Sequence, residues 1–348
     1  MLGIIVTNTG TADAPEEEAI RRYLRQFLAD RHLINVPPVI WKPILELFIL
    51  PNRPRKTLPR YQAFWTPEGS PFMITSREQC RILNEKLQGR LDKPYLVKLA
   101  MRYGNPSIES ALQACMDAGC DRIVALPLYP QWTIPCAGTV LDEFDIQYKK
   151  VCGQNGPELI KILEYWEEPG YVEALADSIA RVWTYKPGSK LIMTYHSIPI
   201  SYITKGHDPY PHTTAETMRR VGERLGIPPE DQVLTYQSRF DSRKWLGPML
   251  KNEAARLGAE GVTDVCAVSP IFATDCIETV WDIDTEARKA YTEAARELGI
   301  MNTKFTFVPS LGTDDAFMNV IANVVEKAAR QGLCSVEVPD ARHAAATR

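Results

Sequence analysis

Apolar runs alternate with amphipathic stretches along most of the chain. Residues 121–127 form a short, mainly apolar run of the kind that predicts a buried strand, and residues 107–119 carry apolar side chains at helical spacing. Repeated alternation of the two predicts βαβ units, in which parallel strands form a sheet that helices cover. The pattern therefore predicts an α/β protein with parallel sheets.

Three segments of the first half resemble three segments of the second half, in the same order. The pairs are IIVTNTG with LIMTYHS (4–10 and 191–197), MRYG with SRFD (101–104 and 238–241) and DRIVALP with DVCAVSP (121–127 and 264–270). The shared order predicts two similar Rossmann-like domains that arose by internal duplication. We place these domains at residues 1–165 and 166–330, and we expect a flexible tail at 331–348.

The first half contains an insertion. Its first two repeated segments lie about 50 residues further apart than their counterparts in the second half, and the extra residues fall at about 30–76. The most apolar part of the insertion, VIWKPILELFILP at 39–51, is too short to span a membrane and contains Lys42 and Glu46. We expect either a helix packed on the domain or an apolar lip over a hydrophobic ligand.

The duplication also predicts which side chains face a ligand. Ligands of open α/β sheets bind outside the carboxyl ends of the strands. Thr9 ends the first strand of the first half and His196 ends the equivalent strand of the second, while Arg102 and Arg239 form another equivalent pair. We therefore expect His196 to face the segment that follows the apolar run at 264–270, although a histidine packed in the core is the alternative.

The segment after that run is strongly acidic, with carboxylates at Asp275, Glu278, Asp282, Asp284 and Glu286. In a helix that begins near Asp275, the side chains of Glu278, Asp282 and Glu286 lie four residues apart on one face. A solvated acidic face is one interpretation, although like charges at this spacing destabilise a helix slightly. The other is a path for a divalent cation such as Fe(II) or Zn(II), because histidine and carboxylates without cysteine suit such ions.

Composition narrows the class of protein. The 348 residues are 45% hydrophobic and 24% charged, which is typical of a soluble globular protein. The net charge of -3 gives no indication of a nucleic-acid partner. The eight cysteines are scattered without a CxxC pair, which favours a reducing compartment. The first residues resemble a strand rather than a signal peptide, so we expect a cytoplasmic protein.

Several multi-residue blocks resemble the signature sequences of the ferrochelatase family, whose members insert the metal in the last step of haem synthesis. The blocks are FLADRHLINVP (27–37), GSPFMITS (69–76), MRYGNPSIESAL (101–112), LPLYPQW (126–132), TYHSIPISYITKGHDPYP (194–211), YQSRFDSRKWLGP (236–248) and IFATDCIETVWDID (271–284). The resemblance covers about residues 3–330. It implies two similar α/β domains with a porphyrin cleft between them.

The resemblance also implies roles for individual residues. The catalytic histidine and glutamate of the family correspond to His196 and Glu278, and Asp282 and Glu286 match its acidic ladder. Metal contacts are thereby implied for all four residues. Porphyrin contacts are implied at Thr9, Met101, Arg102, Tyr103 and Tyr129, with the propionates near Arg53, Lys56 and Ser70.

The resemblance further implies a ferrochelatase that inserts Fe(II) into protoporphyrin IX to form protohaem. Family members that use coproporphyrin III tend to lack the apolar lip and to carry a tyrosine where this chain has Asp13. Coproporphyrin III as substrate and a non-catalytic haem or metal carrier remain the alternatives. No cofactor is implied beyond the substrate Fe(II), and no [2Fe–2S] cluster is expected, because the tail has only Cys334. The apolar lip leaves a peripheral membrane contact open.

Overall fold

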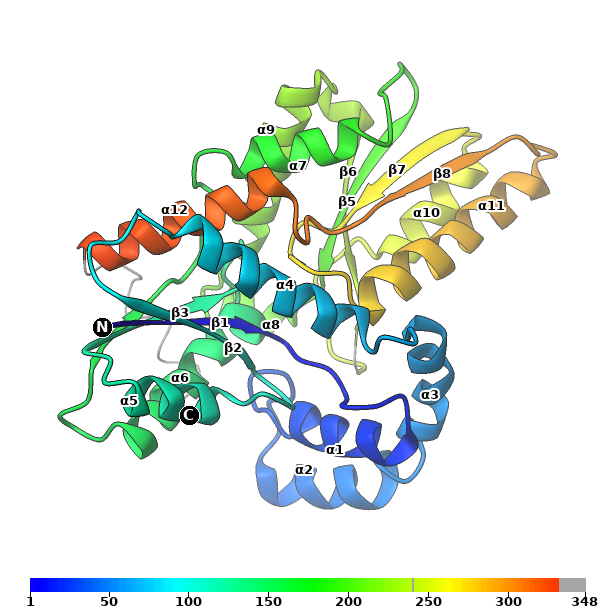
Figure 1. Cartoon of the computed structure of the whole chain (residues 1–348). Helices are drawn as coiled ribbons and strands as arrows, with labels where there is room; N and C mark the ends of the chain where they lie inside the picture. Colours follow the sequence, from blue (N-terminus) through cyan, green and yellow to red (C-terminus); the bar gives the residue numbers. More distant parts are fainter. Residues whose placement is uncertain (240, 332–348) are drawn as a thin grey trace. The chain divides into compact units, whose positions relative to one another are not determined.

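The computed structural model describes residues 1–239 and 241–331 of the chain. It divides into two compact units (Figure 1). Unit 1 comprises Met1–Glu164 together with the described residues from Ile321 onward, and unit 2 comprises Tyr165–Val320. The last helix, α12 (Asp315–Gln331), therefore begins in unit 2 and ends in unit 1, whereas the sequence pattern placed residues 166–330 together. The expected flexible tail lies, apart from Gln331, outside the described residues.

Unit 1 contains a parallel sheet of four strands in the order β2-β1-β3-β4. These are β1 (Leu2–Asn8), β2 (Tyr95–Met101), β3 (Arg122–Pro127) and β4 (Glu158–Lys161). Every residue of β1 is buried, as expected of a central strand that is covered on both faces. The longer helices of this unit outside the insertion are α1 (Glu17–Leu28), α4 (Pro71–Lys86), α5 (Ile108–Asp117) and α6 (Thr139–Val151), with the short π-helix η2 (Ile134–Gly138) before α6.

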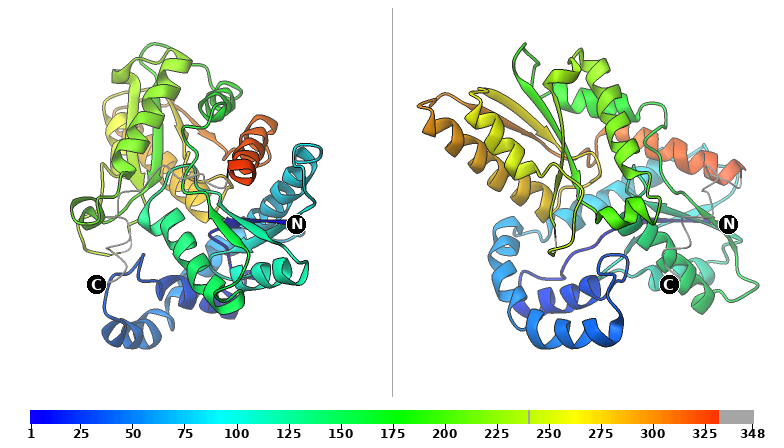
Figure 2. Two further views of the ribbon diagram at one scale, coloured as in Figure 1. Left: turned by 90° about the vertical axis from the view of Figure 1, so that its left-hand side faces the viewer. Right: turned by 180° about the vertical axis from the view of Figure 1, so that it is seen from behind.

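The predicted insertion is helical and packs on unit 1. It contains α2 (Pro38–Ile44), the π-helix η1 (Leu45–Ile49) and α3 (Arg53–Phe64). Both views of Figure 2 show these helices, in lighter blue, beside the dark-blue α1. The indole N–H of Trp41 donates to the carbonyl oxygen of Leu28 (2.6 Å), and Arg25 pairs with Glu46 (2.9 Å). These contacts join α2 and η1 to α1.

Unit 2 repeats the architecture of unit 1. Its parallel sheet has the order β6-β5-β7-β8, with β5 (Lys190–His196), β6 (Gln232–Gln237), β7 (Asp264–Val268) and β8 (Lys304–Val308). Its helices are α7 (Tyr171–Ala180), α8 (Ile200–Thr204), α9 (Tyr210–Leu225), η3 (Pro229–Asp231), α10 (Leu250–Ala259), η4 (Glu278–Ala287) and α11 (Arg288–Glu297). The two strand orders correspond position by position. The prediction of duplicated α/β domains with parallel sheets is therefore confirmed.

Backbone hydrogen bonds within each unit show which residues of the two units are equivalent. The N–H of Met101 donates to the carbonyl of Pro106 (2.7 Å), and the N–H of Tyr236 donates to that of Pro248 (2.8 Å). Met101 and Tyr236 thus hold equivalent positions. Because Asn8 pairs with Met101 and Tyr195 pairs with Tyr236, Thr9 and His196 are equivalent, as the sequence predicted.

The same register corrects a second predicted equivalence. Arg102 corresponds to Gln237, so the expected pairing of Arg102 with Arg239 is wrong by two residues. The loop after β6 is longer than the loop after β2. Arg102 and Arg239 both lie beyond the ends of their strands, where no strand pairing constrains how the two sequences align. Arg239 is exposed.

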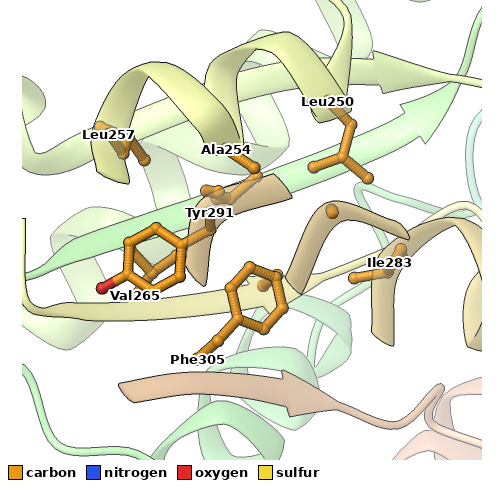
Figure 3. Close-up of a cluster of buried hydrophobic side chains, with 10 residues drawn as sticks. Leu250, Ala254, Leu257, Val265, Ile283, Tyr291 and Phe305 are labelled. Carbon is orange, nitrogen blue, oxygen red and sulfur yellow. The ribbon is translucent and has the colours of Figure 1, made fainter. Parts of the chain in front are cut away.

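A hydrophobic cluster holds η4, α10 and α11 on the sheet of unit 2 (Figure 3). Its members are Ile192, Leu250, Ala254, Leu257, Val265, Ala267, Ile283, Ala287, Tyr291 and Phe305. Ile283 and Ala287 are the members on η4, and both are fully buried. Burial of these two side chains fixes the inner face of η4, while Glu278, Asp282 and Glu286 stay partly exposed.

Candidate functional site

His196 is the last residue of β5, which is a central strand of the sheet in unit 2. The residue therefore lies at the carboxyl edge of that sheet. It pairs with Gln237 of β6 in the parallel ladder. Its Nδ1 lies 2.7 Å from the carbonyl oxygen of Ser197. A carbonyl only accepts hydrogen bonds, so Nδ1 carries the proton and Nε2 is the acceptor nitrogen of the neutral ring.

The surroundings of His196 favour that neutral form. Burial lowers the pKa of His196 below its ordinary value, and the hydrogen bond to Ser197 and the charge of Glu278 only partly oppose this effect. The charge of Glu278 reaches His196, so the structure brings together the two residues expected to be catalytic. A neutral imidazole beside a carboxylate is equipped to accept a proton or to bind a divalent metal.

Asp275 fixes the turn that leads to Glu278. Its Oδ1 accepts hydrogen bonds from the backbone N–H of Ser310 (3.0 Å), the hydroxyl of Ser310 (2.8 Å) and the hydroxyl of Thr279 (3.1 Å). Ser310 follows β8, so these bonds join the loop after β7 to the loop after β8. Next to Asp275, burial and the charge of Glu278 raise the pKa of the Cys276 thiol. Asp275 therefore holds the backbone before Glu278 in place, and Cys276 is a buried neighbour of Glu278.

The acidic segment forms a π-helix rather than the expected α-helix. η4 begins at Glu278, not near Asp275. Backbone bonds in a π-helix reach five residues along the chain, and such helices are frequent at functional sites. The side chains follow the same period: Trp281 Nε1 donates to Glu286 (3.0 Å), and the hydroxyl of Thr285 donates to the carbonyl of Val280 (3.4 Å).

The acidic residues of η4 have separate partners. The hydroxyl of Ser238 donates to Asp282, and Glu286 accepts from Trp281 and lies 3.8 Å from Lys251. Within residues 1–239 and 241–331, no three His, Cys, Asp or Glu side chains are grouped closely enough to hold a metal ion. The structure thus joins His196 with Glu278 but does not gather Asp282 and Glu286 into one ligand set with them.

Unit 1 gathers five of the expected porphyrin contacts at the carboxyl ends of β1, β2 and β3. The hydroxyl groups of Thr9 and Tyr129 are hydrogen-bonded to each other. The backbone N–H of Arg102 donates to Asn8 (2.8 Å), and that of Tyr103 donates to Thr9 (2.9 Å). Met101, Tyr103 and Tyr129 are buried. These residues form one connected wall at the sheet edge.

Sequence reasoning did not identify Asp30, the residue that holds this wall. Asp30 is buried, and its carboxylate binds the guanidinium of Arg102 (2.7 Å) and the hydroxyl of Tyr103 (2.6 Å). The polar groups of Arg102 and Tyr103 thus serve a buried network. Asp30 stands in the block FLADRHLINVP, but its partners are more than 70 positions away, so only the fold reveals their contact.

The expected propionate contacts lie on and before two helices of the insertion region. Burial and the positive charge of Arg60 both lower the pKa of Arg53. The hydroxyl of Ser70, at the N-cap of α4, is buried and has no hydrogen-bond partner within the described residues. A carboxylate ligand would suit Arg53, because it would offset the repulsion between Arg53 and Arg60. It would also suit Ser70, whose hydroxyl can donate at the N-terminus of α4. Lys56 is exposed on α3.

Comparison with solved structures shows the class to which this fold belongs. The structure described as SirB from Bacillus subtilis with Fe3+ matches with a TM-score of 0.56 over 95% of this chain and 96% of the other, at 11% sequence identity. Two duplicated α/β units with the same strand order therefore define a chelatase-like fold.

The sequence comparisons identify the family. The profile of the ferrochelatase family matches residues 1–329. Ferrochelatase from Alcanivorax borkumensis is 38% identical over 329 residues, which are 93% of each chain. Ferrochelatase from Bordetella pertussis is 37% identical over 94% of this chain and 88% of its own, and ferrochelatase 1 from Shewanella oneidensis is 36% identical over 93% and 95%. The chain belongs to the ferrochelatase family.

Membership confirms the resemblance seen in the sequence blocks. The chain is a lyase of haem biosynthesis that inserts a metal ion into porphyrin, so a porphyrin and a metal ion are its substrates. Among the helices of the described residues, none is both long and apolar enough to cross a membrane.

Proposed function

We propose that the porphyrin is protoporphyrin IX, that the metal is Fe(II) and that the product is protohaem. The observation that carries the proposal is the charge around the residues expected to bind porphyrin. Of the three residues expected to bind the propionates, Arg53 and Lys56 are cations, one for each propionate of protoporphyrin IX, whereas coproporphyrin III has four propionates. Burying further carboxylates without partners is unfavourable. The carboxylate of Asp13, which accepts from Asn105 (3.2 Å), stands where coproporphyrin-using relatives tend to carry a tyrosine.

In this proposal, His196 and Glu278 do the proton chemistry. Insertion of a divalent ion displaces two pyrrole protons: the neutral His196 accepts one at Nε2, and the other passes to solvent along the carboxylates of η4. Glu278 stabilises the imidazolium that forms, because its negative charge acts on that ring. The porphyrin-binding residues lower the barrier further if they bind a bent ring better than a flat one, since bending exposes the nitrogen lone pairs.

Asp282 and Glu286 supply the metal in this proposal. Carboxylate oxygens bind divalent ions more weakly than thiolates do, so an ion can move past them. Asp282 accepts a hydrogen bond from Ser238, and Glu286 accepts one from Trp281 and lies 3.8 Å from Lys251. No resident cofactor takes part, and we propose that the protein lacks an [2Fe–2S] cluster. Cys334 lies outside the described residues, so analysis of purified protein for acid-labile sulfide tests this.

We propose that the insertion, which packs on α1, also makes a peripheral membrane contact. Val39 of α2 is 83% exposed, and Leu47 and Phe48 of η1 are 68% and 69% exposed. Exposed apolar groups this close together on a helical segment suit the boundary of a lipid bilayer, and Lys42 adds a positive charge. Flotation with vesicles of phosphatidylcholine and phosphatidylserine tests this: Phe48→Ser should reduce binding, and the control Met301→Ser, at another exposed apolar side chain, should not.

An anaerobic assay decides the substrate. Purified protein is supplied with Fe(II) and with either protoporphyrin IX or coproporphyrin III under identical detergent conditions, and loss of the free-base spectrum is followed. We expect a higher kcat/KM for protoporphyrin IX. A clear preference for coproporphyrin III would overturn the substrate proposal and leave the family assignment intact. Haem binding without turnover of either porphyrin would instead indicate a carrier.

A further inference from the structure

Asp30 is the centre of a buried hydrogen-bond network in unit 1. It follows α1, and its side chain is 3% exposed. Oδ2 accepts hydrogen bonds from Arg102 Nη2 (2.7 Å), from Tyr103 Oη (2.6 Å) and from the hydroxyl of Thr139. Oδ1 accepts from the backbone N–H of His32 (2.7 Å) and faces His32 Nδ1 (2.8 Å). One carboxylate therefore joins the segment after α1 to the end of β2 and to the start of α6.

His32 connects this carboxylate to a second one. Its Nε2 lies 2.7 Å from Asp142 Oδ2, while Nδ1 faces Asp30. Carboxylates only accept hydrogen bonds, so both ring nitrogens carry protons and the ring is an imidazolium. Burial alone would lower the pKa of His32, but the hydrogen bonds and charges of Asp142 and Asp30 outweigh it and raise the pKa to about 9.

The charges around His32 alternate in sign. The ionic groups whose contacts build the network include Asp30 after α1, Asp142 and Glu143 on α6 and Arg102 after β2. Each nitrogen of the Arg102 guanidinium has a partner in the network: Nε donates to Thr139, Nη2 donates to Asp30, and Nη1 lies 3.3 Å from Glu143. Loss of the His32 charge would remove the cation that lies between Asp30 and Asp142, which is unfavourable because the Asp30 carboxylate is buried.

We propose that His32 is a positioning residue for the porphyrin-binding wall of unit 1. It holds Asp30, which fixes Arg102 and Tyr103. These in turn fix the strand end at Thr9, through the hydrogen bond from the Tyr103 N–H to the Thr9 carbonyl (2.9 Å). The inference rests on the proposed binding of porphyrin by these residues. It gives Arg102 the role of a buried countercharge within that wall.

The test compares His32→Ala and His32→Lys with the wild type and with His212→Ala. His212 is an exposed histidine on α9 and serves as the matched control. We expect His32→Ala to raise the porphyrin Kd, measured by fluorescence titration, and the porphyrin KM about tenfold. The kcat at saturating porphyrin and the KM for Fe(II) should stay within about twofold. His32→Lys keeps a cation within reach of both carboxylates, so it should recover most of the affinity.

Two further measurements separate positioning from a merely structural role. The porphyrin affinity of the wild type should fall as the pH rises through about 9, where His32 loses its proton, and His32→Ala should lack this change. In a double-mutant cycle, Asp142→Asn should weaken binding much less in the His32→Ala background than in the wild type. If His32→Ala does not fold, His32→Lys and Asp142→Asn carry the same test.

Unchanged porphyrin affinity and pH profile in folded His32→Ala would overturn the inference. So would a loss of kcat that simply follows the folded fraction seen in thermal unfolding. These outcomes differ from a failure of the proposed function. In that case the wild-type protein itself would not bind protoporphyrin IX or convert it to protohaem.

Discussion

The hydroxyl of Ser238 donates a hydrogen bond to the carboxylate of Asp282, which joins the end of β6 to the π-helix η4. Ser238 has a φ of 64°, in the left-handed region that residues other than glycine seldom adopt. Asp282 therefore has a structural partner as well as its expected role in supplying metal. Variants at the two positions separate these roles.

Asp282→Asn should raise the KM for metal several-fold and lower kcat by less than about threefold. The amide keeps an oxygen that accepts from Ser238 but removes the charge that attracts a hydrated cation. Ser238→Ala keeps the charge and should leave the metal KM near that of the wild type. Steady-state kinetics with varied Fe(II) provide the measurement. Equal kinetics in Asp282→Asn and the wild type, with a change only in melting temperature, would favour a purely structural acidic face.

Glu278→Gln should lower kcat about 100-fold or more, because it removes the charge that acts on His196. Porphyrin binding, followed by fluorescence, should remain within about twofold. Glu293→Gln on α11 is the control, since Glu293 is an exposed glutamate paired only loosely with Lys289 (3.7 Å). A kcat for Glu278→Gln close to that of the control would remove Glu278 from the chemistry.

The pH dependence of activity should report the lowered pKa of His196. An imidazole that must be neutral to accept a proton stays competent until the pH falls below its pKa. Burial lowers that pKa from its ordinary value of about 6.5, so the acid limb of kcat/KM should have its midpoint below pH 6.5. His196→Ala should abolish metal insertion and leave porphyrin binding largely intact. A midpoint above pH 7 would contradict the neutral-base role.

Arg53→Met should raise the porphyrin KM about tenfold or more, because a half-buried cation beside Arg60 loses its charge where a propionate is expected. Arg55→Met is the matched control on the same helix, since the Arg55 side chain is 76% exposed. Porphyrin esters that lack the propionate charges should show no difference between Arg53→Met and the wild type. A penalty that persists with the esters would indicate lost packing instead of lost charge.

Ile283→Ala should lower the free energy of unfolding by about 2–5 kcal/mol, because the side chain is fully buried in the cluster under η4. Ile146→Ala, at an isoleucine that is 59% exposed on α6, should change it by less than about 0.5 kcal/mol. Urea unfolding provides the measurement. If the two variants were equally stable, η4 would not depend on this cluster for its position.

The repeated strands and the strand-end residues could be predicted because both depend on local pattern. Strand periodicity identified β1 and β5 and thereby the equivalence of Thr9 and His196. The pairing of Arg102 with Arg239 was wrong because the loops after β2 and β6 differ in length. Short sequence matches are easily misaligned in loops, where no strand pairing fixes their register. The π-helical form of η4 was not predicted, since a spacing of four residues fits an α-helix equally well.

The network around Asp30 was beyond prediction for a different reason. Its members come from the segment after α1, the end of β2 and the start of α6. Nothing in the neighbouring sequence of Asp30 or His32 shows that Arg102 and Asp142 will meet them. Contacts between residues so far apart along the chain arise only when the sheet forms and brings its crossover helices together.

The equivalence of Thr9 and His196 has a consequence for how the molecule could have evolved. Duplication produced two sheets with the same strand order, and each offers the same edge position to a ligand. In one copy that position carries a titratable ring, and in the other it carries a small hydroxyl that is hydrogen-bonded to Tyr129. The two copies of the ancestral edge have thus diverged, one to a titratable side chain and one to a hydroxyl. If His196 takes the proton, as we propose, selection at the Thr9 position can reshape the preference for a ring substituent without disturbing that group.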